Sequence, residues 1–232
     1  MGSLNKKRLL IIPARGGSKR IPRKNIRQFL GRPLILRVLE EVTKEKLFDD
    51  VHVSSEDDEI LQLVSQFGFS PEFSRDPSLS DDFTPLSLVT TSVLNQYLEL
   101  GKSFDTIVLV YATAAFLRFD TLKSAIEKFE SLGPGVKMIS VAEYPVPIEW
   151  AMRMSDKNEL TPTNPSGLEF RSQDLEPAWY ETAEFVIYDE TSIQPTNPDI
   201  KQIGYPITHM SIDIDTEEDW IKAEKIAKTD HN

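Results

Sequence analysis

The chain has 232 residues, with 37 acidic and 26 basic side chains and therefore a net charge of -11 at pH 7. This negative balance disfavours binding to nucleic acid, whose backbone attracts positively charged surfaces. The chain contains no cysteine, which excludes disulfides, thiol catalysis and zinc–thiolate sites. No apolar run approaches the roughly 18 to 20 residues of a membrane span, so we expect a cytoplasmic protein without a membrane partner.

Apolar runs and helical spacings alternate along the first two thirds of the chain. Unbroken runs such as LLII at 9–12 are typical of strands that are buried on both faces. Apolar residues spaced by three and four predict helices between these runs. Predicted strands cover 9–12, 51–54, 106–111 and 138–142, and predicted helices cover 34–46, 56–66, 85–100 and 120–131, the last capped by Asp120.

This alternation predicts an α/β fold with a mostly parallel sheet and helices on both faces. In such folds, ligands bind beyond the carboxyl ends of the strands, so the loops there are the candidate sites. Five prolines interrupt the pattern between residues 145 and 178, which indicates an inserted arm. We expect one domain over residues 5–229 that includes this arm.

A basic glycine loop follows the first predicted strand. Gly16 and Gly17 permit backbone conformations and close approaches that side chains forbid. The loop contains neither a Walker A motif nor a G-x-G-x-x-G motif. It is interpreted as a phosphate-binding loop, with a solvated surface turn and a nucleic-acid patch as alternatives. Its basic residues are Arg15, Lys19, Arg20, Arg23 and Lys24.

A second candidate site lies at residues 211–216, where aspartates alternate with isoleucines. In extended backbone, Asp213 and Asp215 share one face, which suits Mg²⁺ because this ion takes few protein carboxylates beside substrate phosphates. The alternative is that this segment only leads into a helix, since Thr216 to Asp219 has the form of a capping box. Trp220, in that helix, is expected in the core.

The loop sequence ARGGSK at 14–19, followed by Ile21-Pro22 and Lys24-Asn25, resembles the signature loop of the acylneuraminate cytidylyltransferases. Lys24-Asn25 favours this group over the related Kdo cytidylyltransferases. The resemblance implies a Rossmann-like three-layer α/β/α nucleotidyltransferase fold, CTP as a substrate, and a divalent metal held by Asp213 and Asp215. It assigns nucleotide binding to Arg15, Gly16, Gly17, Ser18, Lys19, Lys24, Asn25, Arg75, Thr84 and Tyr111.

Two later segments resemble the pseudaminic acid branch of this family. They are YAT, which begins at Tyr111, and RSQDL, which begins at Arg171. A guanidinium such as that of Arg171 suits the sugar carboxylate or a phosphate, because it binds two oxygens at once. The resemblance implies that the arm reaches a second subunit, so that the protein is a homodimer. The expected sugar-binding residues are Arg171, Gln173, Tyr180 and Glu184.

The chain departs from both branches near the sugar site. Thr182 replaces the asparagine of sialic acid synthetases, and Glu184 replaces a glutamine of the pseudaminic branch. The leading hypothesis is CMP transfer from CTP to a nonulosonic acid, most closely pseudaminic acid, with release of pyrophosphate. Arg15, Lys19 and Arg171 are the expected catalytic residues. The alternatives are N-acetylneuraminic or legionaminic acid as the sugar, or a nucleotide-binding protein without activity.

Overall fold

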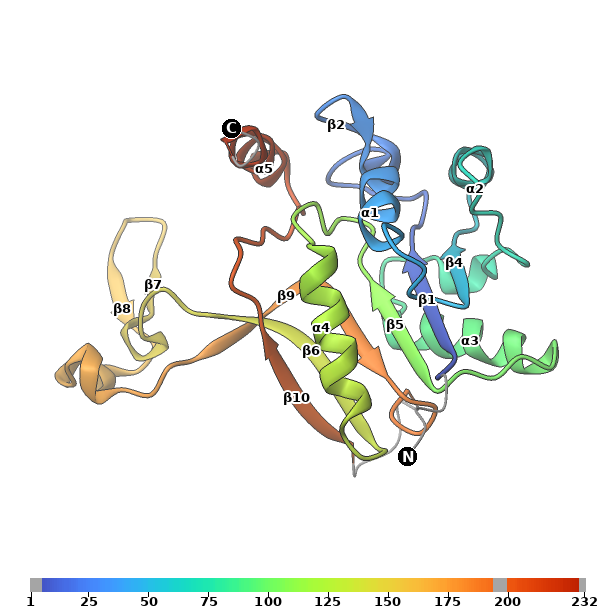
Figure 1. The fold of residues 1–232 in the computed structure, drawn as a ribbon. Helices are drawn as coiled ribbons and strands as arrows, with labels where there is room; N and C mark the ends of the chain where they lie inside the picture. The colour runs from blue at the N-terminus through green and yellow to red at the C-terminus, as the bar shows by residue number, and fades with distance from the viewer. Residues whose placement is uncertain (1–5, 194–199, 230–232) are drawn as a thin grey trace.

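The structure, a computed structural model, describes residues 6–193 and 200–229, so residue 5 of the expected domain lies outside it. Its centre is a six-stranded sheet in the order β10-β6-β9-β5-β1-β4 (Figure 1). Five strands are parallel and β9 is antiparallel to both its neighbours. The strands are β1 (Arg8–Pro13), β4 (Asp50–Ser54), β5 (Thr106–Val110), β6 (Val136–Glu143), β9 (Trp179–Tyr188) and β10 (Lys201–Pro206).

Helices cover both faces of this sheet, which confirms the predicted α/β architecture. They are α1 (Leu34–Val42), α2 (Asp58–Gln66), α3 (Leu86–Glu99), α4 (Phe119–Glu130) and α5 (Glu217–Thr229). The prediction that Asp120 caps its helix is wrong. The helix begins one residue earlier, and the backbone N–H of Phe119 donates to Glu41 Oε1 at 2.8 Å, so a carboxylate from α1 acts as the cap.

The alternation of side chains along β1 divides the core into two layers. Leu10 and Ile12 pack with α1, α2 and α4, whereas Leu9 and Ile11 pack with α3 on the opposite face. All four side chains are completely buried, and each contributes about 1.5–3 kcal/mol through removal of apolar surface from water. The LLII run is therefore apolar throughout because β1 is covered on both sides.

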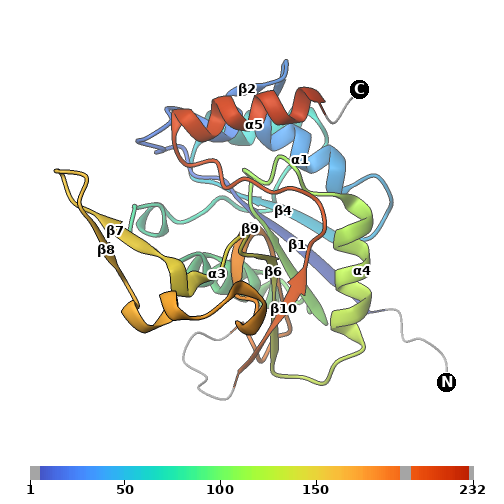
Figure 2. The same cartoon turned by 90° about the vertical axis from the view of Figure 1, so that its left-hand side faces the viewer.

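A third apolar cluster lies at the carboxyl end of the sheet, beneath α5 (Figure 2). Trp220 is 2% exposed and meets the ring of Phe29 edge-on, with the ring centres 5.5 Å apart. Ile21 from the glycine loop and Ile214 from the aspartate segment are buried in the same cluster. Trp220 is thus a core residue, as predicted, and its cluster anchors both candidate sites.

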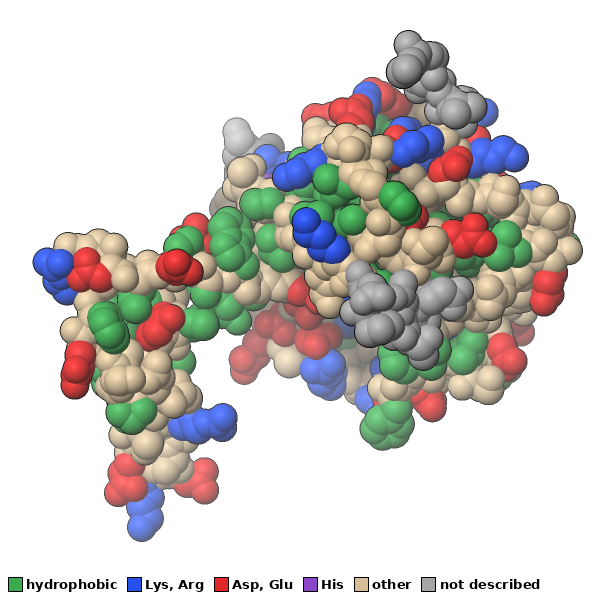
Figure 3. All heavy atoms as spheres, turned by 90° about the horizontal axis from the view of Figure 1, so that it is seen from below, with side chains coloured by type: hydrophobic (Ala, Val, Ile, Leu, Met, Phe, Trp, Pro, Cys, Tyr) green, Lys and Arg blue, Asp and Glu red, His purple; other side chains and the backbone are tan. Residues whose placement is uncertain are grey.

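The segment between β6 and β9 projects from the body as an arm (Figures 1 and 2). It contains a small antiparallel hairpin of β7 (Met152–Met154) and β8 (Leu160–Pro162). A second short antiparallel pair, β2 (Gln28–Phe29) and β3 (Arg32–Pro33), lies outside the arm. Hydrophobic side chains are visible on the surface of the arm in Figure 3. Among the described residues, no helix has the length and apolarity required to cross a membrane.

A buried histidine predicts how the fold responds to acid. His52 on β4 is fully buried, and its Nδ1 lies 3.2 Å from the hydroxyl oxygen of Tyr97. Burial, together with a smaller contribution from the nearby charge of Arg75, lowers the pKa of His52 from 6.5 to about 4. As the pH falls from 6.5 towards 4, unfolded chains take up this proton and folded chains do not, so the folded state loses stability.

We expect His52 to account for about 2 kcal/mol of the decrease in unfolding free energy between pH 7 and pH 5. Urea unfolding of the wild type and of His52→Gln at both pH values measures this contribution, because glutamine does not titrate there. The decrease should be smaller in the variant by that amount. An equal decrease in both proteins would show that folding does not hinder protonation of His52.

Candidate active site

The glycine loop lies where β1 ends, at the carboxyl edge of the sheet. Ala14 N–H donates to the carbonyl of Ser54 at 2.9 Å, and Gly16 N–H donates to Glu56 Oε1 at 2.8 Å. A Cβ atom on Gly16 would overlap the carboxylate of Asp57, whereas one on Gly17 would meet no atom within 4 Å. Neither glycine has a positive φ, so Gly16 is required here for close approach to Asp57 rather than for an unusual backbone angle.

An ion-pair network attaches the glycine loop to the loop after β4. Arg23 forms a two-pronged pair with Asp57, at 2.5 and 2.9 Å, and a further pair with Glu59 at 2.5 Å. The Arg23 hydrogen bonds hold the pKa of Asp57 below its usual value, and Asp57 Oδ1 also accepts from Ile60 N–H to cap α2. These acidic residues are not among those predicted from the sequence, although their place directly after a parallel strand is a signal for a site.

A cavity of about 250 Å³ opens beside this loop and brings together many of the predicted nucleotide-binding residues. Its floor is Arg75, which is 6% exposed and donates to the carbonyl of Ser54 at 2.7 Å and to its hydroxyl at 3.1 Å. Burial lowers the pKa of Arg75, opposed in part by Glu56. The predicted residues that line this cavity are Arg15, Lys24, Asn25, Arg75, Thr84 and Tyr111.

A second cavity, of about 370 Å³, is adjacent to the first, and the two share four lining residues, Arg15, Lys24, Asn25 and Asp82. Ser18, Lys19, Arg20 and Asp215 complete its lining. Asp82 pairs with Arg15 at 2.7 Å and also with Lys19, and these contacts lower the pKa of Asp82. Four basic side chains therefore surround a space in which acidic groups of the protein already balance part of their charge.

The two aspartates of the 211–216 segment have different surroundings. Asp215 pairs with Arg20 at 2.9 Å and with Lys24 at 3.1 Å. Asp213 makes no hydrogen bond or ion pair with any described residue, and burial together with the charge of Asp215 raises its pKa. The predicted alternation holds, since Ile214 is completely buried while solvent reaches Asp213.

This arrangement fits a divalent cation. Two mutually repelling carboxylates, one of them without a neutralising partner, are stabilised when a cation binds between them. No group of three or more His, Asp or Glu side chains in the described ranges forms a ready-made metal site. Mg²⁺ does not require one, because it usually completes its shell with waters and substrate phosphates.

Tyr111 connects the first cavity with β9. Its hydroxyl donates to Glu181 Oε1 at 3.0 Å, and its backbone N–H donates to the carbonyl of Glu184 at 3.0 Å. Burial and the negative charge of Glu181 raise the pKa of Tyr111, so it is a neutral hydrogen-bonding residue at physiological pH.

The predicted sugar-binding residues do not gather in either cavity. Arg171 and Gln173 lie on the arm in an exposed turn, and Arg171 pairs with Asp174 at 2.7 Å. Tyr180, at the start of β9, contacts the ring of Tyr144, with the ring centres 5.0 Å apart. Glu184 is buried against His209 and lines neither cavity. Their sugar-binding roles stay predictions, because in one chain the arm points away from the body.

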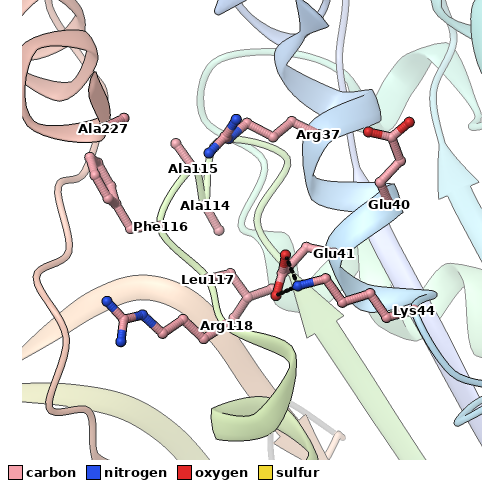
Figure 4. Close-up of a pocket in the computed structure, with 10 residues that line it drawn as sticks. All are labelled: Arg37, Glu40, Glu41, Lys44, Ala114, Ala115, Phe116, Leu117, Arg118 and Ala227. Atoms are coloured by element: carbon pink, nitrogen blue, oxygen red, sulfur yellow. Dashed lines mark hydrogen bonds and ion pairs between the residues drawn. The ribbon is translucent and has the colours of Figure 1, made fainter. Parts of the chain in front are cut away.

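A larger cavity, of about 500 Å³, lies between α1, the 114–118 loop and α5 (Figure 4). It contains none of the predicted site residues, and Figure 4 shows Glu41 and Lys44 paired with each other at its edge. Glu41 is also used to cap α4. The candidate active site is therefore the pair of adjacent cavities, where the glycine loop meets Asp215; Asp213 lines neither cavity but lies within the electrostatic range of Lys24 and Arg20.

Comparisons with known proteins identify the family of this chain. Residues 9–221 match the family described as cytidylyltransferase, and the chain therefore belongs to that family. A pseudaminic acid cytidylyltransferase from Campylobacter jejuni subsp. jejuni serotype O:2 is 37% identical over 179 residues, which are 77% of each protein. A CMP-N,N'-diacetyllegionaminic acid synthase from Legionella pneumophila subsp. pneumophila is 27% identical, over 94% of this chain and 95% of that protein.

A similar fold occurs in a solved structure of CMP:2-keto-3-deoxy-manno-octonic acid synthetase complexed with CTP. The TM-score is 0.68 at 16% identity, with 97% of this chain and 99% of that chain covered. The nucleotidyltransferase fold expected from the sequence is thereby confirmed. The resemblance to acylneuraminate cytidylyltransferases, and to the pseudaminic acid branch in particular, is confirmed by the curated relatives.

The two glycines of the loop provide a matched test of its packing. Gly16→Ala should lower the unfolding free energy by about 1–3 kcal/mol, because its new methyl group displaces the Asp57 carboxylate that holds Arg23. Gly17→Ala should change it by less than about 0.5 kcal/mol, since the added methyl group meets open space. Urea unfolding measures the unfolding free energy of both variants, and equal decreases would contradict the close approach of Gly16 to Asp57.

Proposed function

We propose that the protein transfers CMP from CTP to the anomeric hydroxyl of a nonulosonic acid and releases pyrophosphate, with pseudaminic acid as the sugar. The observation that supports this proposal is the pair of adjacent cavities, in which cations from the glycine loop face Asp215, while Asp213 lies outside their lining but within the electrostatic range of Lys24 and Arg20. The 37% identity to a pseudaminic acid cytidylyltransferase supports the choice of sugar.

The nucleotide is assigned to the two cavities according to their charge. In the first, Arg75, Thr84 and Tyr111 offer guanidinium and hydroxyl groups to the base and ribose. In the second, Arg15, Lys19 and Lys24 surround the triphosphate, together with Ser18 and Asn25. Asn25 Nδ2 donates to the carbonyl of Arg15 at 2.9 Å, which fixes the start of the loop before the nucleotide arrives.

Charged side chains of the protein contribute to the transfer of CMP. Arg15 and Lys19 exchange the Asp82 carboxylate for phosphate oxygens, so the negative charge that develops on the leaving pyrophosphate meets fixed cations. Asp213 and Asp215 are the residues that would hold a divalent metal. When bound, this metal supplies Lewis-acid stabilisation of the phosphate oxygens. No described histidine faces the cavities, since His52 and His209 are both buried.

The arm is assigned to the interface of a homodimer. It exposes many large apolar side chains outside the core, and such an accumulation is typical of a protein–protein interface. In a dimer, the arm of one subunit can bring Arg171 and Gln173 to the site of its partner, where the guanidinium would meet the sugar carboxylate. The exposed apolar residues are Tyr144, Val146, Ile148, Trp150, Met152, Met154, Leu160, Leu168, Phe170, Trp179 and Tyr180.

Turnover with a panel of sugars tests the activity and the sugar together. Wild-type protein is supplied with CTP, Mg²⁺ and either pseudaminic, legionaminic or N-acetylneuraminic acid, and pyrophosphate release is measured. We expect the highest kcat/KM with pseudaminic acid. A higher value for another acid would reassign the sugar. CTP binding without turnover of any acid would leave only a nucleotide-binding function.

The role of Asp213 is tested by Asp213→Asn. We expect a loss of kcat on the order of 100-fold or more with little change in thermal stability, because the residue has solvent contact and no partner to lose. Glu218→Gln, which also removes one acidic charge nearby on α5, is the control and should retain activity. Activity of Asp213→Asn at the level of the control would refute a role in metal binding.

The dimer is tested by placing charge on the arm. Phe170→Asp introduces a carboxylate on an apolar side chain that is 54% exposed, and should shift the protein towards a monomer in sedimentation velocity. Ile221→Asp, at a 51% exposed position on α5, is the control and should leave the wild-type assembly unchanged. A wild-type protein that sediments as a monomer at all concentrations would contradict the assignment.

A further inference from the structure

A buried pair of titratable side chains lies beside the active site. His209 Nε2 is 3.0 Å from both carboxylate oxygens of Glu184, and each side chain is 1% exposed. The two residues are distant in the sequence. Glu184 belongs to β9, and His209 belongs to the connection from β10 to α5, which contains Asp213 and Asp215.

This connection has few backbone contacts of its own. Residues 207–215 belong to no helix or strand. Ile207 N–H donates to the carbonyl of Val141 at 2.9 Å, and the Ser211 hydroxyl donates to the carbonyl of Thr182 at 3.3 Å. Between these two points, the contact of His209 with Glu184 is the only side-chain hydrogen bond that joins the described part of this connection to the sheet. Further along, Lys24 Nζ donates to the carbonyl of Ile214 at 2.6 Å and Ile214 is buried, so the aspartates are held from the sheet side by His209 and Ser211 and from the glycine-loop side by Lys24.

Glu184 is itself held in a fixed position. The β6–β9 ladder shifts register between Ile139 and Val141, and Ala183 adopts a positive φ of 52° at this point of β9. Ser140 bridges the irregularity, since its hydroxyl lies 2.9 Å from Thr182 Oγ1 and accepts from Phe185 N–H at 3.1 Å. The irregularity is characteristic of a bulge, which redirects a side chain.

The same residue also contacts the nucleotide side of the site. The carbonyl of Glu184 accepts from the backbone N–H of Tyr111, and Tyr111 lines the cavity assigned to the nucleotide. One residue thus joins the end of β5, through its backbone, to the aspartate connection, through its carboxylate. These two contacts fix the distance between the nucleotide cavity and the metal-binding aspartates.

The pair is not optimised for stability. His209 Nδ1 is buried without a partner among the described residues, and an enclosed ionisable pair loses its hydration. Well-packed apolar side chains would stabilise such a position at least as well. A buried polar contact that loses its hydration but orients a neighbouring segment is typical of residues that hold the ligands of a metal site in place.

We propose that Glu184 and His209 are positioning residues, which hold the connection at the geometry in which Asp213 and Asp215 bind a divalent cation beside the triphosphate. The inference rests on the proposed function for its kinetic consequences. In this proposal Glu184 orients the aspartate connection from outside the cavities, in place of the direct sugar contact that the sequence indicated.

Three variants test the proposal. His209→Ala removes the contact, His209→Gln retains an N–H donor towards Glu184, and Tyr97→Phe removes the buried hydroxyl contact with His52 as a control. We expect His209→Ala to raise the half-saturating Mg²⁺ concentration and lower kcat by about 10- to 100-fold, with unchanged CTP binding in the absence of metal. His209→Gln should recover most of this loss, and Tyr97→Phe should match the wild type.

A second readout needs no turnover. In the metal-free protein, amide hydrogen exchange of residues 210–215 should be faster in His209→Ala than in the wild type and in Tyr97→Phe. This measurement tests the positioning role even if no sugar is turned over, so the failure of the proposed function is distinguishable from failure of this inference.

If His209→Ala does not fold, the double variant Glu184→Leu/His209→Leu replaces both partners by apolar groups, which preserves stability but removes the directional contact. Folded His209→Ala protein, or the folded double variant, with wild-type Mg²⁺ dependence and wild-type exchange would overturn the proposal. A folded variant with raised Mg²⁺ demand and faster exchange, rescued by His209→Gln, would establish it.

Discussion

The site depends on the parallel pairing of β1 with β4, because it places an acidic loop directly against a basic one. The two strands end in register, with Pro13 opposite Ser54. Glu56 and Asp57 follow one strand, and the glycine loop follows the other. Gly16 N–H then meets Glu56, and Arg23 meets Asp57, so the loop is shaped by the protein itself rather than by the nucleotide. Preorganisation of this kind lowers the entropy lost when a charged ligand binds.

Contacts within the protein also explain how a chain with a negative net charge can form a cavity lined by basic side chains. The chain has a net charge of -11, yet four basic side chains converge on the phosphate-binding space. Asp82 and Asp215 pair with these cations at 2.7 to 3.1 Å, which limits their mutual repulsion in the folded state. In the proposed function, triphosphate binding is an exchange of one set of anions for another, and its affinity depends on the difference between them.

The sequence predicted those features of the structure that depend on the local pattern of apolar and polar residues. The LLII run predicted β1 because both faces of that strand are covered, and the alternation at 211–216 predicted which side chains face solvent. β9 and β10 were not predicted, because β9 is half exposed at its first residues and β10 is an edge strand with a partly polar sequence. The partner of Glu184 could not be read from the sequence either, since the contact with His209 is created by the chain's return from β10.

The position of the arm within the topology has a consequence for how this family can diversify. The arm leaves the sheet at the end of β6 and returns at the start of β9, and these strands are antiparallel neighbours. In topological terms it is the loop of a hairpin, and such loops tolerate insertion and replacement without altering the connections of the sheet. The arm is thus an exchangeable module: its length and sequence can change while β1, the glycine loop and the aspartate connection keep their places.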